Sequence, residues 1–398
     1  MKTTHIPAIA SNIWKLYVLQ ALTQALFIIP IIVLFWQSYG LNLQQIMLLQ
    51  SGFALTVFVL EIPTGYLADR WGRRNTLILG CCFGFVAYLT YATGQTFWHF
   101  LCAEILIGIG SSLLSGTVEA MTYDTLLELG REREYRKVAG NQAFFEFNTE
   151  AASGILGGLL GAISLVLPLW LTAIPMACAI FIAVSLQEPK RHTLHEPKHL
   201  KAIFRTSAHA LFWHPGLRMI IMTFGLISSL SLILFWFFQP YQNLVDVPIA
   251  LFGITHAVTL VAGAFAAKSV SWFEKRVDDR LLLIIPAFMT VICFLSLSLP
   301  PAPFLLVFFL ISRLSWHFVG PLSADLINRM TSSDVRATVL SVRSFFSRLL
   351  FVCASPFVGA LADARGIPHA LFVSGIIGGV VILFVFVSTR SAWKEIPA

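Results

Sequence analysis

Two carboxylates in an otherwise apolar stretch are the residues of this chain best placed to do chemistry. Glu146 and Glu150 are one helical turn apart, so they share a face of the helix expected over residues 138–162. At 1.5 Å per residue they lie ~12 and ~18 Å from its start. Carboxylic acids that are removed from water and lie close together hold protons more readily than free ones. We therefore expect them to carry protons, although a structural pair held by arginines or backbone donors fits the same spacing.

Basic and imidazole side chains in the second half of the chain form the next group. Arg313, Arg343 and Arg348 fall inside long apolar stretches. A charge at membrane depth is costly unless it faces a cavity or a partner, so we expect these arginines to attract the carboxylate pair or an anionic substrate. His256 and His317 are candidates for a proton relay, with ordinary packing as the alternative.

Polar and aromatic residues near the start of the chain suggest a binding surface for organic molecules. Tyr17, Gln20 and Gln24 follow at i, i+3 and i+7, which places them along one face of a helix. Amide and aromatic groups bind organic compounds without demanding a single geometry, and helix packing explains such residues equally well. The other candidates for the same cavity are Asn148, Ser228, Ser231 and Trp236.

These residues must be positioned by membrane-spanning helices. The chain has 398 residues, of which 57% are hydrophobic and only 12% charged. Its mean hydropathy of +0.79 is too high for a soluble globular domain. Each span needs roughly 20 apolar residues, so about twelve spans fit, with no room for a catalytic module. The expected spans are 12–36, 45–68, 75–94, 97–124, 138–162, 165–187, 217–240, 248–272, 281–299, 303–328, 337–362 and 367–389.

The charges indicate how the spans are oriented. Lys and Arg cluster in alternate loops, which by the positive-inside rule places those loops and both termini in the cytoplasm. This pattern accounts for the net charge of +7 without a nucleic-acid partner. The longest hydrophilic segment, residues 188–215, is expected to form a cytoplasmic linker with an amphipathic helix, between a first bundle over 1–187 and a second over 216–398.

Motifs of soluble enzymes are absent from the sequence, and neither a cofactor nor a resident metal is expected. His192, His195 and His199 have spacings that suit a metal, but a solvated linker is the preferred interpretation. The six cysteines all fall within apolar spans and are expected to act as small hydrophobic residues.

The two halves repeat one another at a nearly constant offset. Asp124 and Asp325 are 201 residues apart, and so are Trp71 and Trp272. Chance matches would scatter in register, so these pairs indicate tandem six-helix halves, an architecture of transporters.

One charged segment between the second and third spans is more specific than any of these features. It runs Gly-Tyr-Leu-Ala-Asp-Arg-Trp-Gly-Arg-Arg over residues 65–74, and such a density of charge must lie outside the hydrocarbon. The segment resembles the loop signature of the major facilitator superfamily. The residues that carry the resemblance are Gly65, Asp69, Arg70, Gly72, Arg73 and Arg74.

The resemblance implies a fold of twelve transmembrane helices in two pseudo-symmetric six-helix bundles, with a substrate cavity between them. It also implies that the loop braces the cytoplasmic side as a gate. Asp69 is then expected near the start of the eleventh span, at Ala337, and Arg73 is expected to pair with Asp124. A solvated turn that is kept only for topology is the alternative.

Two departures from the family pattern bear on function. Glu104 stands ahead of Gly108 and Gly110, where the family commonly has an arginine, so the proton-coupling role of that arginine is in doubt here. Glu104 itself is a further candidate for proton coupling. The fifth span keeps Gly140, Gly157 and Gly158 of the glycine-rich series typical of drug–proton antiporters, but not the whole series. The resemblance to that branch is therefore partial.

The sequence thus predicts a proton-coupled secondary transporter that works by alternating access. We expect it to export an amphipathic organic compound, as a monomer in a bacterial inner membrane. Transport of an anionic metabolite or siderophore is the alternative within transport, and a non-transporting receptor or scramblase is the alternative from another class.

Overall fold

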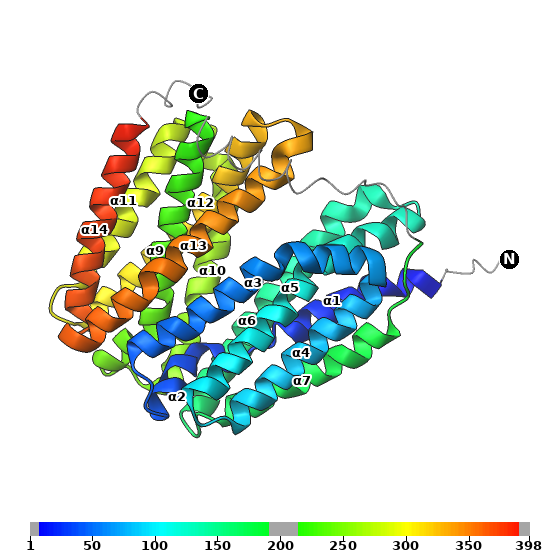
Figure 1. Cartoon of the computed structure of the whole chain (residues 1–398), viewed down its shortest axis with the longest axis horizontal. Coiled ribbons are helices and arrows are strands. Elements are labelled where there is room, and N and C mark those ends of the chain that lie inside the picture. Colours follow the sequence, from blue (N-terminus) through cyan, green and yellow to red (C-terminus); the bar gives the residue numbers. More distant parts are fainter. Residues whose placement is uncertain (1–7, 191–213, 390–398) are drawn as a thin grey trace. The chain divides into compact units, whose positions relative to one another are not determined.

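The computed structural model describes residues 8–190 and 214–389, and the described part is α-helical with no strand (Figure 1). It packs as two compact units. Unit 1 contains the described residues of Met1–Leu41, Gly52–Leu194 and Pro248–Ala257, and unit 2 contains those of Asn42–Ser51, His195–Val247 and Val258–Ala398. The linker helix and the three linker histidines expected from the sequence lie outside the described residues.

Unit 1 is built from the helices of the first half of the chain, together with the first part of α10. Its core consists of buried apolar side chains from α1, α4, α5 and α7, including Leu16, Leu77, Met121 and Ala179. The helices are α1 (Asn12–Thr23), α2 (Ile32–Ser38), α3 (Leu43–Trp71), α4 (Arg73–Thr93), α5 (Phe97–Glu128), α6 (Tyr135–Gly161) and α7 (Leu167–Ser185).

Unit 2 contains the remaining helices and the first residues of α3. Its core includes Ile220, Leu283, Leu322 and Val339, which α9, α11, α12 and α13 contribute. The helices are α9 (Pro215–Leu244), α10 (Ile249–Phe273), α11 (Asp279–Leu297), α12 (Val307–Met330), α13 (Ser333–Arg365) and α14 (Ile367–Ser388). Thus α3 and α10 are each shared between the units.

The expected membrane architecture is confirmed. Within residues 8–190 and 214–389, 10 helices are long and apolar enough to cross a membrane. Helix α6 is not among them because it carries Glu146, Glu150 and a basic first turn, yet its 27 residues are long enough to span. The remaining span is the first one, which is divided into α1, the 3₁₀ turn Ile29–Ile31 and α2.

The break in the first span corrects the continuous helix expected over 12–36. Helix α1 ends at Thr23, and regular α-helix resumes only at Ile32. Pro30 lacks an amide proton, and its ring would clash with the carbonyl group of Leu26 in a continuous α-helix, which explains a break at this place. A short stretch of non-helical backbone, Gln24 to Ile28, therefore lies within the first span.

A row of glycines on α6 accommodates this break. A Cβ on Gly157 would overlap the carbonyl oxygen of Phe27, and one on Gly161 would collide with Ile31. Next to Gly157 in the chain, Gly158 lies against the backbone of Gly253 in α10. The glycines kept from the antiporter series thus allow backbone-to-backbone packing inside unit 1. Gly140 is different, since nothing lies within 4 Å of the position of a Cβ there.

Candidate functional site

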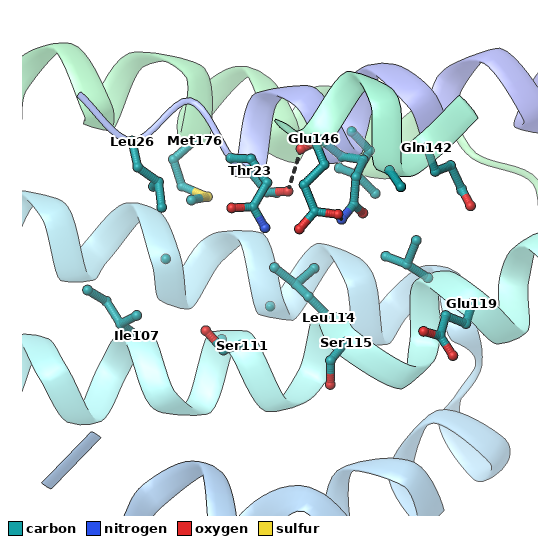
Figure 2. A pocket seen from close by; sticks show the side chains of 18 of the residues that line it. Thr23, Leu26, Ile107, Ser111, Leu114, Ser115, Glu119, Gln142, Glu146 and Met176 are labelled. Atoms are coloured by element: carbon teal, nitrogen blue, oxygen red, sulfur yellow. Dashed lines mark hydrogen bonds between the residues drawn. The ribbon is translucent and has the colours of Figure 1, made fainter. Parts of the chain in front are cut away.

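A cavity of about 490 Å³ lies inside unit 1, among α1, α4, α5, α6 and α7 (Figure 2). Gly80 and Gly84 of α4 line one wall, where α4 and α5 pack so closely that a Cβ on Gly110 would lie 2.9 Å from the carbonyl oxygen of Gly80. Close helix packing therefore explains Gly110. Gln24 and Leu26, from the break in the first span, also line the cavity. The cavity is large enough for a small organic molecule.

The side chain of Glu146 projects from α6 into this cavity (Figure 2). Its Oε2 atom accepts a hydrogen bond of 2.9 Å from Nε2 of Gln20 on α1. This hydrogen bond holds the carboxyl group of Glu146 next to α1. The polar face expected from Gln20 and Gln24 is therefore brought together with Glu146.

Sequence reasoning missed the wall that faces Glu146 from α5. Figure 2 shows Ser111 and Ser115 across the cavity from Glu146, with Glu119 farther along the same helix. The three residues follow at i, i+4 and i+8, so their spacing alone could have identified a polar stripe. Glu119 and Glu146 are the charged residues among those that line the cavity, and the described lining includes no Lys or Arg. The cavity therefore has acidic character.

Glu150, one turn after Glu146, has a different environment. Its Oε1 atom lies 3.6 Å from Nε2 of His256, which is 3% exposed and belongs to the part of α10 that packs in unit 1. Gly154 makes room for the imidazole, because a Cβ there would lie 3.2 Å from Cδ2 of His256. The two carboxylates expected to act as a pair thus have separate partners, and His256 is next to one of them.

Glu104 is buried and does not line the cavity. It is 4% exposed and accepts a hydrogen bond of 2.5 Å from the hydroxyl of Tyr91. Tyr91 packs against Trp36 and Phe100, with ring centroids 6.2 and 5.8 Å away. The residue that replaces the usual arginine of the family is therefore held among aromatic side chains.

The expected cavity residues of the second half lie within unit 2. Ser231 is fully buried and exchanges hydrogen bonds with Ser312. Arg313 is 9% exposed, and its guanidinium lies 4.9 Å from the ring of Phe235 and 4.7 Å from that of Trp316. The space beside Ser231 and Arg313 is only about 10 Å³, which is room for no more than a water molecule. Ser228 and Trp236 are buried in α9.

Arg343, Arg348 and His317 occupy other parts of unit 2. Nη1 of Arg343 donates to the carbonyl oxygen of Gly320 and to Oγ of Ser323, at 2.9 and 2.7 Å. Arg348 lies on the same helix, α13, and is partly buried. His317 on α12 packs directly against Gly263 of α10. Hydrogen bonds within its own unit explain the burial of Arg343 without a substrate.

Two other expected cavity residues of unit 1 lie outside the cavity that holds Glu146. Tyr17 stacks on Phe145 of α6, with centroids 5.6 Å apart, and accepts a long hydrogen bond from Asn141. Asn148 donates to the carbonyl oxygen of Phe144 and lines a shallower pocket beside the break in the first span. Both residues therefore have packing roles in the structure.

The charged loop between α3 and α4 is tied to two other parts of unit 1. Nη1 of Arg73 lies 2.7 Å from Oδ2 of Asp124, the partner expected from the sequence. Glu188 caps the first turn of α4, since its carboxylate accepts from the amides of Arg73 and Arg74 at 2.9 and 2.8 Å. Sequence reasoning missed Glu188, although it directly follows the sixth predicted span.

The backbone of this loop requires one of its two glycines. Gly72 has a φ of 109°, which a residue with a side chain rarely adopts, and it separates α3 from α4. A Cβ on Gly65 would meet nothing within 4 Å, so no close packing is seen there. Asp69 and Arg70 lie in the last turn of α3, where Arg70 donates to the hydroxyl of Tyr66.

At the repeat-related position in unit 2, one of the two charges is reversed. The offset of 201 residues aligns Arg73 with Glu274 and Asp124 with Asp325. Arg329 lies between the acids of unit 2, at 2.9 Å from Asp279 and 2.7 Å from Asp325. Burial, and then the charge of Asp325, raise the pKa of the Glu274 carboxyl above its ordinary value, and Arg329 offsets part of this. The second half thus keeps the position of the first ion pair with different chemistry.

Comparison with known proteins identifies drug-resistance proteins as relatives in sequence. The chain is 21% identical over 231 residues to the quinolone resistance protein NorA of Staphylococcus aureus, covering 57% of this chain and 58% of that protein. It is 25% identical over 243 residues to the class C tetracycline resistance protein of Escherichia coli, with 58% of each chain covered. The alignments thus span about three-fifths of the length of these curated relatives.

Solved structures share the fold over nearly the whole chain. The nucleoside transporter NupG superposes with a TM-score of 0.78 at 12% identity, over 96% of this chain and 99% of that one. A bacterial homologue of the human lysosomal transporter Spinster gives 0.77 at 14% identity, over 99% of both chains. The family model of the Major Facilitator Superfamily matches residues 13–351. The chain has the twelve-helix fold of transporters and belongs to the major facilitator superfamily.

Proposed function

We propose that this protein is a proton-coupled secondary transporter that exports an amphipathic organic compound by alternating access. The observation that carries the proposal is Glu146, a carboxylate held by Gln20 inside a cavity of about 490 Å³. A carboxylate in such a place can hold either a proton or a positively charged group of a substrate, but not both. Exchange of one for the other would couple the two movements.

The remaining cavity wall supports an organic substrate. Leu19, Leu26, Ile107 and Met176 provide apolar surface, while Ser111, Ser115 and Gln24 provide hydrogen-bonding groups. Apolar walls with a few polar groups are typical of sites that bind organic molecules. Because the charged residues of the lining are Glu119 and Glu146, the anionic metabolite considered from the sequence is disfavoured. The drug-resistance proteins among the relatives support export.

Energetically, a proton can drive this exchange if it binds one conformation better than the other. A ligand shifts a conformational equilibrium only by its differential affinity for the two states. We propose that protonation of Glu146 supplies that difference in affinity. We also propose that both termini and the loop of Arg73 lie on the cytoplasmic side of a bacterial inner membrane. A monomer contains all of these residues.

Transport in proteoliposomes tests the proposal. Purified protein with an imposed pH gradient should move a fluorescent organic cation, and the rate should rise with the gradient. In Glu146→Gln that dependence should disappear, and counterflow of the cation without a gradient should weaken, because the variant lacks the carboxylate that would bind the positive charge of the substrate. Absence of counterflow in the wild-type protein would instead indicate a receptor or scramblase. A Glu146→Gln variant with full dependence on the gradient would overturn the proposed role of Glu146.

A further inference from the structure

An apolar groove of about 460 Å³ on unit 2, outside the candidate site, has features of a lipid-binding surface. It is formed by the last turns of α10, the first half of α11 and the middle of α12. Phe273 and Phe318 meet edge to face, with centroids 5.7 Å apart. Phe265, Ile285 and Met289 leave 68, 48 and 37% of their surfaces exposed. Since these helices cross a membrane, hydrocarbon is the medium that meets this surface.

The length of the groove matches one leaflet of a bilayer. Along α10 the lining runs from Phe265 to Phe273, and along α11 from Leu282 to Met289. At 1.5 Å per residue these stretches rise ~12 and ~10 Å, against ~15 Å for half of a hydrocarbon core. Both start at the loop that joins α10 to α11, and Val277 of that loop completes the lining. An acyl chain in the groove would therefore have its headgroup at this loop.

The loop presents positive charge at the same place. Lys275 and Arg276 are exposed and stand between Phe273 and Val277, which both line the groove. Arg276 is held in position, because its guanidinium lies 4.0 Å from the ring of Trp272 and Nη1 donates to the carbonyl oxygen of Trp272 at 3.0 Å. An oriented guanidinium next to a flexible ammonium is suited to bind a phosphate.

Two of the acids near this loop lie next to other cations. Asp278 lies 3.9 Å from Arg280, and Asp279 pairs with Arg329. Glu274 faces Asp325, Asp279 and Arg329. No acid of residues 8–190 or 214–389 forms an ion pair with Lys275 or Arg276.

The lipid-facing side of α10 adds a further cation. Lys268 is exposed one turn before Trp272. A lysine in this position extends its ammonium toward the membrane surface, where tryptophan side chains also concentrate. The loop end of the groove thus carries Lys275 and Arg276, and the last turns of α10 add the exposed Lys268 and Trp272.

We propose that this groove binds an anionic phospholipid, with one acyl chain between α10, α11 and α12 and the phosphate at Lys275 and Arg276. Basic pockets between membrane helices are suited to anionic headgroups, whereas a zwitterionic lipid offers the same chain without the net charge. The proposal is independent of the transported compound and of Glu146.

Native mass spectrometry of the full-length protein in detergent tests it, with phosphatidylglycerol and phosphatidylcholine of identical acyl chains as probes. The wild-type protein should retain phosphatidylglycerol preferentially. Each basic residue near an anionic surface contributes roughly 1 kcal/mol to binding. Lys275→Gln with Arg276→Gln should therefore weaken that retention by about tenfold to thirtyfold. The matched control is Arg136→Gln with Lys137→Gln, which removes an exposed basic pair at the start of α6 and should retain the preference.

A second set of variants tests the groove itself. Ser269→Phe places a ring in the groove and should weaken retention of both lipids. The headgroup variant, Lys275→Gln with Arg276→Gln, should affect only phosphatidylglycerol. Ala266→Val fills less space at the same surface and provides the measurement if Ser269→Phe does not fold. Equal retention of the two lipids by the wild-type protein, or an unchanged preference in the headgroup variant, would overturn the proposal.

Discussion

Glu150 and His256 lie in contact within unit 1, with Oε1 and Nε2 3.6 Å apart, while Glu146 one turn earlier bonds to Gln20. The two carboxylates share a helix face, yet one faces the cavity and the other faces an imidazole that is 3% exposed. We therefore expect the two carboxylates to differ in their effect on transport.

Single substitutions should separate the two carboxylates. Glu146→Gln should reduce transport driven by a pH gradient by at least ~10-fold, because a positioned proton-transfer group contributes that much or more. Glu150→Gln should reduce transport less, since it does not line the cavity. Initial rates in proteoliposomes at several imposed gradients measure both effects. Equal losses in the two variants would show that the carboxylates act as one unit.

The Glu150–His256 contact should be measurable as an energetic coupling. A double-mutant cycle with Glu150→Gln and His256→Gln should give an interaction free energy of ~1 kcal/mol, within the usual range for residues in contact. Apparent unfolding free energies in a fixed detergent provide the four values. The pair Glu150→Gln and Lys15→Gln has no such contact and should be additive. Additivity in the first cycle would mean that the contact contributes nothing to folding.

The glycine row of α6 should tolerate no side chain at the break in the first span. Gly157→Ala would force a methyl group into the carbonyl oxygen of Phe27, so we expect destabilisation of ~1–3 kcal/mol, as for an overpacked core. The control is Gly140→Ala on the same helix, where nothing lies within 4 Å of a Cβ. Alanine there should be stabilising by ~0.5–1 kcal/mol through helix propensity. Thermal unfolding of both variants measures the difference, and a neutral Gly157→Ala would contradict the packing.

The Arg73–Asp124 ion pair should contribute to stability and to transport because its two charges are opposite. Arg73→Asp places two acids at a separation now bridged at 2.7 Å, and should lower both stability and transport. Exchange of the charges, Arg73→Asp with Asp124→Arg, should recover part of the loss, worth ~1 kcal/mol for a partly exposed pair. Thermal stability and transport rate should recover together if the pair braces the gate. Recovery of stability alone would restrict the pair to folding.

Glu274 should make the folding stability of the protein depend on pH, with a sign that follows from its raised pKa. Its carboxyl pKa is raised in the folded protein by burial and by Asp325, so ionisation of Glu274 opposes folding. Stability from this group is highest below the ordinary pKa of glutamate, ~4.3, and falls as the pH rises through the raised pKa. Glu274→Gln should therefore raise the apparent melting temperature at pH 7, and the gain should vanish in acid.

Glu134 supplies the control of opposite sign. A hydrogen bond and ion pair with Arg131 lower the pKa of the Glu134 carboxyl, so ionisation favours the folded state. Glu134→Gln should lower the melting temperature slightly at pH 7, and this loss should disappear as the pH falls. If both substitutions changed stability in the same direction at pH 7, the assignment for Glu274 would be wrong.

The sequence was sufficient for the features that depend on hydropathy and charge. The apolar runs predict the helices because each must bury its backbone polar groups in hydrocarbon. The ion pair of Arg73 with Asp124 was predictable from the loop signature. The break at Gln24–Ile28 was missed because hydropathy does not register a lost helical hydrogen bond, although Pro30 was a local signal.

The cavity was only partly predictable. Gln20, Gln24 and Glu146 follow from polar residues at helical spacing, and Ser111, Ser115 and Glu119 could have been found by the same rule. The partner of Glu150 could not, since His256 is far away in the chain and only the fold brings it close. Likewise, Arg343 was expected in a cavity, but a carbonyl and a hydroxyl of α12 satisfy it, and sequence does not reveal which acceptors are available.

The sharing of α3 and α10 between the units bears on any attempt to produce the halves separately. A cut in the linker would leave unit 1 without Pro248–Ala257 and unit 2 without Asn42–Ser51. The first fragment would then expose the glycines of α6 that now pack on Gly253. In the second, Asp363 would lose its hydrogen bonds from the amides of Leu43 and Gln44, which are 2.9 and 2.8 Å long. Each fragment alone therefore lacks part of its folding unit. We expect either fragment to fold only when the two are co-expressed.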